Sequence, residues 1–550
     1  MLKTIEVVIN KQKYQISNGV TLEEIASQFQ NNYKYPILIA KVNNKLEELS
    51  KEITSPSTIE FLDLTTREGN RSHISGLTYV LIYAIKKLYG KTANAIIQHS
   101  LDKGIYIQTN FKLNENKVNA IKQEMQSIIA SDMPITKVTI DRMEAIEYFE
   151  KMNDYAKAGV MKYNTNSYVT LYRLGNYYNY FYNLMPVSTG RLAAFDLTSL
   201  KEDGFLLQFP TVYIPDQIKP YQPHPGVFGV FKEHRDWGKI IHVENSVDLN
   251  RVVSSGKISD LIRISETLQS NRLLNIAKEI NNKKDVKIVL IAGPSSSGKT
   301  TTTAKLCMYL QSFGLHPKML SMDDYFVERG ETPLDEKGQP DYECLEAVDL
   351  NLFNTQLESL LKGEEVNIPT YNFAIGKKEY KKKLKLESDD IILIEGIHAI
   401  NTNILTNIPR ENKYKIYISA LTELNIDDHN RVSTTDNRLL RRIIRDNRTR
   451  GYNVEHTLKT WVSVRRGEER HIFPFQDEAD CTLNTALIYE LGVLKTYVEP
   501  LLYSVAYESP FYEEARRLIN FLRLFLPIPA DDIPKDSVLR EFIGNGCFHD

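Results

Sequence analysis

Alternating apolar and polar residues dominate the first 65 positions of the chain. Ile5, Val7 and Ile9 fall on one face of a predicted strand, and Thr21 and Glu24 have the spacing of a capping box at the start of a helix. The pattern predicts, in order, strands at 3–9 and 14–16, a helix from residue 22, and strands at 37–42 and 58–64. This order indicates a small sheet covered by one helix.

The next two hundred residues mix helical and strand patterns. We expect a helix over 74–89, ended by Gly90, and a tyrosine-rich strand within 172–185 that packs on a helix. An apolar stripe with helical spacing over 246–281 predicts one or two helices, so 246–284 is interpreted as a helical linker.

A buried strand at 286–292 leads into the most informative stretch of the chain. The residues that follow, Gly293-Pro-Ser-Ser-Ser-Gly298-Lys299-Thr300, match the phosphate-binding loop G-x-x-x-x-G-K-[ST], and helical spacing continues from Thr301 to Gly314. Glycines allow successive backbone N–H groups to face a phosphate chain, and the helix N-terminus adds partial positive charge. We therefore predict phosphate binding by Gly293, Ser295, Ser296, Ser297, Gly298, Lys299, Thr300 and Thr301.

Carboxylates follow the two neighbouring predicted strands. Asp323 and Asp324 come after a strand at 317–321, and Glu395 ends an apolar strand over 391–394. Ligands bind at this edge of an α/β sheet. We expect only one of Asp323 and Asp324 to face the phosphate loop, because neighbouring residues at a strand end point to opposite sides.

Composition narrows the class of protein. The 550 residues suggest several domains, and a formal net charge of −2 gives no global attraction to nucleic acid or membranes. The four cysteines form no C-x-x-C pair, and no apolar run of eighteen residues exists, so we expect a cytoplasmic protein that does not span a membrane. The oligomeric state stays open.

An ordered set of motifs resembles uridine kinase and phosphoribulokinase. It comprises the phosphate loop, Ser-Met-Asp323-Asp-Tyr-Phe, Asp341 to Asp349, Ile368 to Phe373, Ile391 to Gly396, and Arg438 to Gly451. The resemblance implies ATP and Mg²⁺ as cofactors, with Lys299, Asp323 and Arg445 as catalytic residues. It further implies that Asp323, Glu343, Tyr371 and Arg445 contact the acceptor, that Arg450 contacts the triphosphate, and that Thr300, Glu395 and Asp323 hold Mg²⁺.

Two positions depart from that family. Gly376 stands where uridine kinases carry a histidine, and Tyr452 stands where they carry an arginine that reads the base. A site without these donors should discriminate the pyrimidine poorly. Arg441, Arg442, Arg445, Arg448 and Arg450 have the spacing of a basic lid helix, and for about half of them we expect a solvated helix face.

The N-terminal half resembles a different set of proteins. Residues 1–65 are similar to a TGS domain, and 66–245 to the editing domain of threonyl-tRNA synthetases. That editing site needs His and Cys side chains, but only His73 is present, and Leu77, Phe181 and Met185 stand at the other positions. We therefore expect the fold without editing chemistry, and a packed or capping role for His73.

The whole pattern predicts a multidomain α/β protein. Its parts are expected to be a β-grasp TGS-like domain at 1–65, an α+β editing-like domain at 66–245, the helical linker at 246–284, a P-loop parallel-sheet kinase domain at 285–520 and a C-terminal tail at 521–550. The predicted activity is ATP-dependent phosphorylation of a hydroxyl of a nucleoside, uridine- or cytidine-like, or of a related small acceptor. The alternative is an RNA- or ribosome-associated regulatory ATPase.

Overall fold

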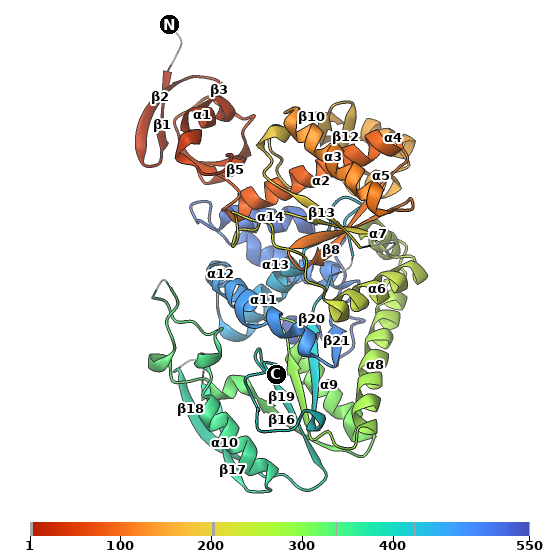
Figure 1. Ribbon diagram of the computed structural model, residues 1–550, viewed down its shortest axis with the longest axis vertical. Helices are drawn as coiled ribbons and strands as arrows, with labels where there is room; N and C mark the ends of the chain where they lie inside the picture. Colours follow the sequence, from red (N-terminus) through yellow and green to blue (C-terminus); the bar gives the residue numbers. More distant parts are fainter. Residues whose placement is uncertain (1–3, 201–203, 337, 373–374, 423, 549–550) are drawn as a thin grey trace.

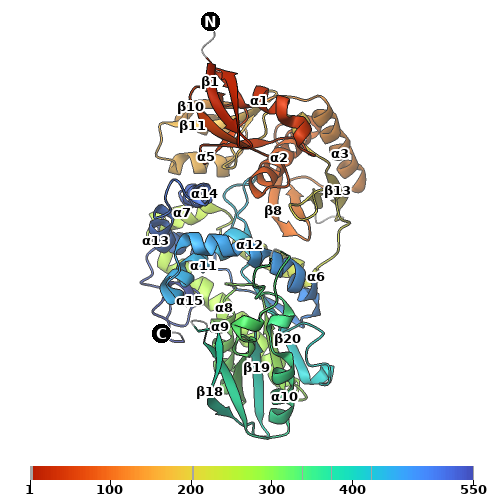
Figure 2. The same ribbon diagram turned by 90° about the vertical axis from the view of Figure 1, so that its left-hand side faces the viewer.

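The computed structural model describes residues 4–200, 204–336, 338–372, 375–422 and 424–548. The chain forms a multidomain α/β molecule built in tiers along its long axis (Figures 1 and 2). The N-terminal half lies at one end, a layer of helices follows, and a parallel sheet lies at the other end. No helix within these ranges is both long and apolar enough to cross a membrane.

The first tier contains a small five-stranded sheet covered by one helix. The strand order is β2-β1-β7-β4-β5. Its elements are β1 (Thr4–Ile9), β2 (Gln12–Ser17), α1 (Leu22–Phe29), β4 (Ile39–Val42), β5 (Lys45–Glu48) and β7 (Ser57–Leu62), with the short pair β3 (Val20–Thr21) and β6 (Glu52–Ile53). The capping box forms as predicted, since Thr21 N donates to Glu24 Oε2 at 2.9 Å. Strand β5 is absent from the prediction, although Asn43 and Asn44 adopt the positive φ that a tight hairpin requires.

The second tier is an α+β region around a long buried helix. This helix, α2 (Arg67–Tyr89), begins seven residues before the predicted start, because the Thr66 side chain accepts a hydrogen bond from Gly69 N at 3.1 Å. Two sheets surround it, with strand orders β10-β11-β12 and β13-β14-β9-β8. Their strands are β8 (Ala95–Leu101), β9 (Gly104–Thr109), β10 (Ile135–Asp141), β11 (Tyr168–Leu174), β12 (Tyr177–Asn179), β13 (Asp196–Ser199) and β14 (Phe205–Gln208), with helices α3 (Glu115–Ala130), α4 (Arg142–Lys151) and α5 (Tyr155–Tyr163).

The tyrosine-rich segment packs on α2, as expected. Tyr79 Oη donates to the carbonyl oxygens of Tyr172 and Tyr177, at 2.6 and 2.8 Å. His73 is also buried on α2, and its Nε2 accepts a hydrogen bond from Ala193 N at 3.1 Å.

Nothing around His73 forms a polar catalytic cluster. Leu77, Phe181 and Met185 all lie in the surrounding apolar core. Burial lowers the pKa of His73 to about 4, so its ring is neutral at physiological pH.

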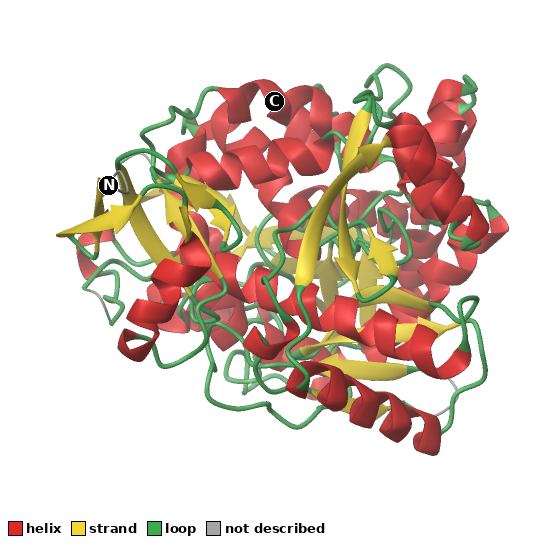
Figure 3. Ribbon diagram, turned by 90° about the horizontal axis from the view of Figure 1, so that it is seen from above, coloured by secondary structure: helices red, strands yellow, loops and turns green. Residues whose placement is uncertain are grey.

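The last tier is a five-stranded, wholly parallel sheet with helices on both faces. Its order is β16-β19-β15-β20-β21, so the strand before the phosphate loop lies at the centre. The strands are β15 (Ile288–Ala292), β16 (His316–Ser321), β19 (Asp390–Glu395), β20 (Lys413–Ser419) and β21 (Cys481–Asn484), and the flanking elements include α9 (Lys299–Ser312), α10 (Leu350–Leu361) and the hairpin β17 (Val366–Asn372) with β18 (Lys377–Leu384). Seen from above, helices surround the strands and the N-terminal sheet projects to one side (Figure 3).

Helices between the two halves form the largest apolar core. They are α7 (Ser246–Ser254), α8 (Ile258–Asn282), α11 (Thr434–Arg450), α12 (Val454–His471), α13 (Glu490–Tyr503), α14 (Tyr512–Leu522) and α15 (Arg540–Ile543). Helix α6 (Pro225–Ile240) packs instead with the parallel sheet, through Val227 and Phe231. One continuous cluster joins buried residues of α4 and α5 with those of α7, the start of α8, and α11 to α15. Segment 246–284 is helical, as predicted, and its first half belongs to this shared core. The proposed division of the chain into domains therefore cuts through continuous packing.

A buried lysine ties the two halves together. Lys157 on α5 is fully buried, and its Nζ lies 3.0 Å from Asp154 Oδ2 and 3.3 Å from Asp427 Oδ1. Asp427 comes from the loop before α11. Buried charges persist only when they are paired, so this triad fixes the editing-like region against the C-terminal part.

Replacing this lysine tests the interdomain contact. Lys157→Met keeps the side-chain length but leaves two buried carboxylates without their cation, so we expect the free energy of unfolding to fall by about 3–5 kcal/mol. Lys162→Met on the same helix removes a half-exposed pair with Glu150 and should cost at most about 1 kcal/mol. Urea denaturation measures both, and equal small effects would contradict the role of the triad.

Candidate functional site

The phosphate loop has the backbone shape that anion binding requires. Ser296 and Gly298 have positive φ values of 58° and 85°, which turn successive N–H groups inward. Gly293 lies against strand β20, where a Cβ would approach Ile418 O to 2.0 Å, so only glycine fits. Helix α9 begins directly at Lys299.

The polar groups of the loop point to a phosphate ligand. The side-chain oxygens of Ser296 and Ser297 are buried and have no hydrogen-bond partner among the described residues. Lys299 Nζ lies on the loop itself, 3.0 Å from Gly293 O and 3.3 Å from Pro294 O. These donors, together with the N-terminus of α9, fit the phosphates of a nucleotide.

A cluster for a divalent cation lies beside the loop. Glu395, at the end of β19, accepts hydrogen bonds from Thr300 Oγ1 at 3.4 Å and from Ser321 Oγ at 3.3 Å. Burial, and after it the nearby Asp323 carboxylate, raises the pKa of Glu395 to about 7. No group of three His, Cys, Asp or Glu side chains in the described ranges could hold a metal alone. One carboxylate and one hydroxyl fit Mg²⁺, which takes its remaining ligands from phosphates and water.

Asp323 and Asp324 differ in their surroundings. Both lie on the 3₁₀ helix η4 (Met322–Tyr325), so the strand alternation from which we argued does not apply. Asp324 Oδ1 accepts a hydrogen bond from Tyr371 N at 3.1 Å, and burial raises its pKa. The half-buried Asp323 carboxylate makes no hydrogen bond with another described residue, and its charge acts on both Glu395 and Glu343.

The expected acceptor residues lie further from the loop. Burial raises the pKa of Glu343 to about 7 against the opposing charge of Arg442, and Glu343 Oε2 has no partner among the described residues. Tyr371 is 6% exposed and packs against Phe326, so little of its ring is available. Tyr342, on the other side of Phe326, is 40% exposed. The motif residue Phe373 lies outside the described residues.

The two positions that depart from the family are occupied in specific ways. Gly376 has a φ of 69°, and a Cβ there would approach Arg329 Nε to 2.8 Å, so the Arg329 side chain takes the place that a residue at 376 would need. Tyr452 is 42% exposed, and its ring lies 4.1 Å from that of His456. Residues 377–384 form strand β18 of a hairpin.

Helix α11 supports the phosphate loop with buried arginines. Arg438 donates hydrogen bonds to Glu468 Oε2 at 2.8 Å and to Ser295 O at 3.1 Å. Arg441 is ion-paired with Glu490 and donates to Thr485 O at 2.9 Å. These carboxylates neutralise the two guanidinium groups, so both arginines serve the shape of the loop.

The remaining arginines of α11 differ in the residues that they contact. Arg442 donates to Ser295 Oγ at 2.7 Å. Arg445 and Arg450 lie 3.0 and 3.3 Å from the buried Asp446 carboxylate, and burial lowers the pKa of Arg450 to about 10. Arg441 is fully buried and Arg442 largely buried, whereas Arg448 and Arg450 are exposed, so only part of this basic helix face is solvated.

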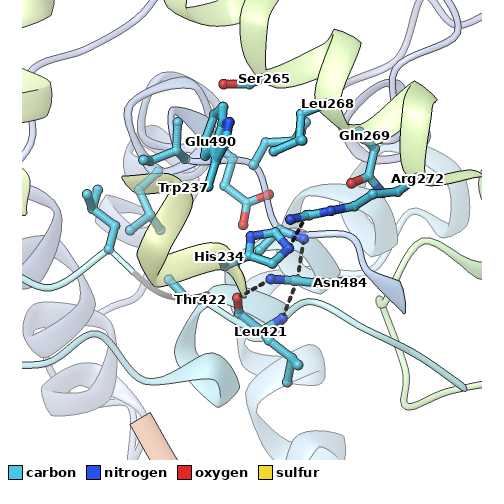
Figure 4. Close-up of a pocket in the computed structure, with 15 residues that line it drawn as sticks. His234, Trp237, Ser265, Leu268, Gln269, Arg272, Leu421, Thr422, Asn484 and Glu490 are labelled. Atoms are coloured by element: carbon cyan, nitrogen blue, oxygen red, sulfur yellow. Dashed lines mark hydrogen bonds between the residues drawn. The ribbon is translucent and has the colours of Figure 1, made fainter. Parts of the chain in front are cut away.

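A small cavity with a largely apolar wall lies behind this support. It has a volume of about 40 Å³, enough for one water molecule, and Glu490 reaches it from α13. Figure 4 shows His234 hydrogen-bonded to Arg272 in its wall, near the paired Asn484 and Leu421. Burial lowers the pKa of His234 well below its usual range, so the ring is neutral beside Arg272.

The C-terminal tail reaches the phosphate loop, which was not anticipated. Glu541 on α15 accepts hydrogen bonds from Thr301 N at 3.2 Å and from Thr301 Oγ1 at 2.9 Å. A Cβ at Gly298 would approach Val538 Cγ2 to 2.3 Å. Arg448 holds the Glu541 carbonyl oxygen at 2.9 Å, and Lys305 on α9 lies 2.6 Å from Asp536. A carboxylate therefore lies at the N-terminus of α9, where a phosphate would bind.

Several contributing residues were missed because their partners are distant in sequence. Arg438, Glu468 and Glu541 each contact the loop from more than 140 positions away, as in the Arg438–Ser295 contact. The residue spacing within the tail, 521–550, carries no chemical signal of this contact.

Comparison with known proteins agrees with the C-terminal part of this description. Uridine kinases of Staphylococcus epidermidis and Staphylococcus aureus are 29% and 28% identical over 194 and 198 residues, which is 35% and 36% of this chain and 84% and 86% of those proteins. Among solved structures, a possible uridine kinase from Bacillus stearothermophilus is 24% identical, with 24% of this chain and 70% of that chain covered, at a TM-score of 0.21. D-glycerate 3-kinase from Cryptococcus neoformans is 15% identical, with 49% and 90% covered, at a TM-score of 0.22. Both TM-scores lie below the level at which a shared fold follows.

The family comparison places the match on the parallel sheet and the helices that hold its loop. Residues 288–487, from β15 to the loop after β21, match the model of the Phosphoribulokinase / Uridine kinase family. The C-terminal region of this chain thus has the P-loop kinase fold, and the match supports an ATP-dependent kinase.

Proposed function

We propose that the protein transfers the γ-phosphoryl group of ATP to a hydroxyl of a nucleoside or a related small acceptor. The observation that carries this proposal is the juxtaposition at one sheet edge of a phosphate loop, the Glu395–Thr300 pair and the unpartnered Asp323 carboxylate. A phosphate loop alone would fit any nucleotide-binding protein. The added free carboxylate supports a site that also activates a hydroxyl.

The residues have distinct roles in this mechanism. Bound Mg²⁺ and ATP supply the transferable group and neutralise its charge. The loop amides and Lys299 hold the phosphates, and Thr300 and Glu395 orient the cation. Asp323 accepts the proton of the acceptor hydroxyl. At the same time the hydroxyl oxygen forms a bond to the γ-phosphorus, and the bond between the γ-phosphorus and ADP breaks. In this proposal Arg445 and Arg450 contact the triphosphate once Asp446 releases them.

The acceptor end of the site lacks the two side chains that we expect to read a pyrimidine in uridine kinases. Glu343 would bind sugar hydroxyls, and the exposed ring of Tyr342, which packs on Phe326, offers a surface for a base. Arg329 and Tyr452 occupy the base-reading side. We infer a nucleoside or sugar acceptor with relaxed base preference.

The acceptor panel is the direct test of this function. The full-length protein is incubated with Mg²⁺, ATP and each of a series of nucleosides and sugars, and phosphorylated product is detected by mass spectrometry. We expect product with at least one acceptor, and loss of turnover in Lys299→Ala with the fold retained. ADP formed only by hydrolysis, unaffected by any acceptor, would instead favour the regulatory ATPase.

The two adjacent aspartates provide a matched pair of variants. Asp323→Asn keeps the size of the general base but removes its charge, so kcat should fall by about a hundredfold to ten-thousandfold while ATP affinity changes little. Asp324→Asn still accepts the hydrogen bond of Tyr371 N, so its kcat should fall less than about tenfold. Steady-state kinetics measures kcat for both variants. A larger loss of kcat in Asp324→Asn than in Asp323→Asn would contradict the role of Asp323 as the general base.

The Glu541 carboxylate should compete with the nucleotide phosphates. Glu541→Gln removes the negative charge from the N-terminus of α9, so we expect ATP to bind about three- to tenfold more tightly. Glu508→Gln, on the exposed surface before α14, is the control and should leave ATP affinity unchanged. Titration calorimetry measures both. Weaker ATP binding in Glu541→Gln would mean that this carboxylate supports the nucleotide site.

A further inference from the structure

A second and wider cavity lies away from the phosphate loop. It has a volume of about 310 Å³ and opens between α2 of the editing-like region and α11, α12 and α14 of the C-terminal part. This volume is within the range of sites that bind small molecules. Neither the kinase mechanism nor the family match accounts for it, since half of its lining comes from residues before 288.

The lining is strongly basic. Five arginines face only two carboxylates there, namely Arg67, Arg71, Arg431, Arg465 and Arg517 against Asp436 and Glu514. The carboxylates are already engaged by two of the arginines, because Glu514 lies 2.7 Å from Arg71 and Asp436 lies 2.7 Å from Arg517. Arg465 is ion-paired with Glu468 and Glu469 at the edge of the cavity.

Two arginines remain without a direct ion-pair partner among the described residues, although the Asp436 carboxylate acts on Arg431 from a distance. The guanidinium groups of Arg67 and Arg431 form no ion pair or hydrogen bond with any other residue that the structure describes. Arg431 is half-buried, and burial lowers its pKa. Desolvating a cation without a partner is costly, and a bound anion would remove that cost. A guanidinium also presents a fork of donors that matches a phosphate.

Aromatic rings line the same cavity. Tyr213, Tyr182 and Trp461 contribute to its wall, and Tyr213 is 48% exposed. Trp461 already packs against the guanidinium groups of Arg438 and Arg442, so Tyr213 offers the freest ring face. A ring of this kind stacks on a heterocyclic base without strong base preference.

From these observations we propose that the cavity is a second ligand site, which binds a nucleoside monophosphate group. Its phosphate pairs with Arg67 and Arg431, and its base lies on Tyr213. A free mononucleotide and the terminal nucleotide of an RNA strand both carry this phosphate and base. The first turn of α11 lines this cavity through Asp436, while Arg438 and Arg441 on the same helix hold the phosphate loop. The ligand therefore binds on the element that shapes the kinase site.

Calorimetric binding to the full-length protein tests the proposal. The probes are AMP, UMP, adenosine, and a short oligoribonucleotide ending in adenosine. We expect AMP or UMP to bind at least tenfold more tightly than adenosine, and Arg431→Ala to weaken that binding about tenfold or more. Binding should persist in Lys299→Ala, which separates this site from the phosphate loop. Oligonucleotide binding alone, lost in Arg431→Ala, would support the site with RNA as the source.

The controls keep the result interpretable. Arg263→Ala removes an arginine whose side chain is 71% exposed on α8, and it should leave every affinity unchanged. The Arg431 guanidinium makes no ion pair or hydrogen bond within the part of the chain that the structure describes, so Arg431→Ala should not lower the midpoint of thermal unfolding, and Arg431→Lys should bind with intermediate affinity. Unchanged binding in Arg431→Ala, loss of binding in Lys299→Ala instead, or no binding of any probe would overturn the proposal.

Discussion

Two buried ion pairs beneath the phosphate loop determine how the rest of the C-terminal half is arranged. Arg438–Glu468 and Arg441–Glu490 place full charges in a region without solvent, and each guanidinium also donates to a backbone carbonyl near or within the loop. Such pairs contribute little net stability, but they allow few alternative packings, since any shift leaves a buried charge without a partner. Although burial opposes it, Arg438 and Arg465 hold the pKa of Glu468 at about 2, so the support stays ionised across the physiological range.

The charges that remain free for a ligand are therefore a small subset of the basic residues. Lys299, Arg442 and the Asp446-bound Arg445 and Arg450 lie around the loop, and the tail carboxylate of Glu541 reaches the same place from the opposite side. Positive charge attracts the nucleotide, and the tail opposes it. The balance between the two is set by a segment of less than thirty residues, packed through Val538 and Asp536 onto the helix that begins at Lys299.

Local signals in the sequence were sufficient for the elements but not for their contacts. The loop Gly293–Thr300 and the strand carrying Glu395 follow from spacing and apolar runs alone. The start of α2 was placed too late, because the Thr66 cap precedes a polar first turn with no apolar period. Whether an arginine of α11 is buried depends on carboxylates at positions 468 and 490, and a helical pattern does not reveal such distant partners. The Glu541–Thr301 contact joins positions that are 240 residues apart, so local periodicity does not reveal it either.

The continuous core through α4, α5, α7, α11 and α13 also has a consequence for cooperativity. Unfolding units follow shared packing rather than sequence boundaries, so the helices that hold the phosphate loop melt together with part of the editing-like region. A fragment beginning near residue 285 would expose to water the apolar faces that Ile146, Phe149 and Val247 now cover. Helices α4, α5 and α7 thus act as folding partners of the helices that hold the phosphate loop, and we expect a C-terminal fragment without them to aggregate.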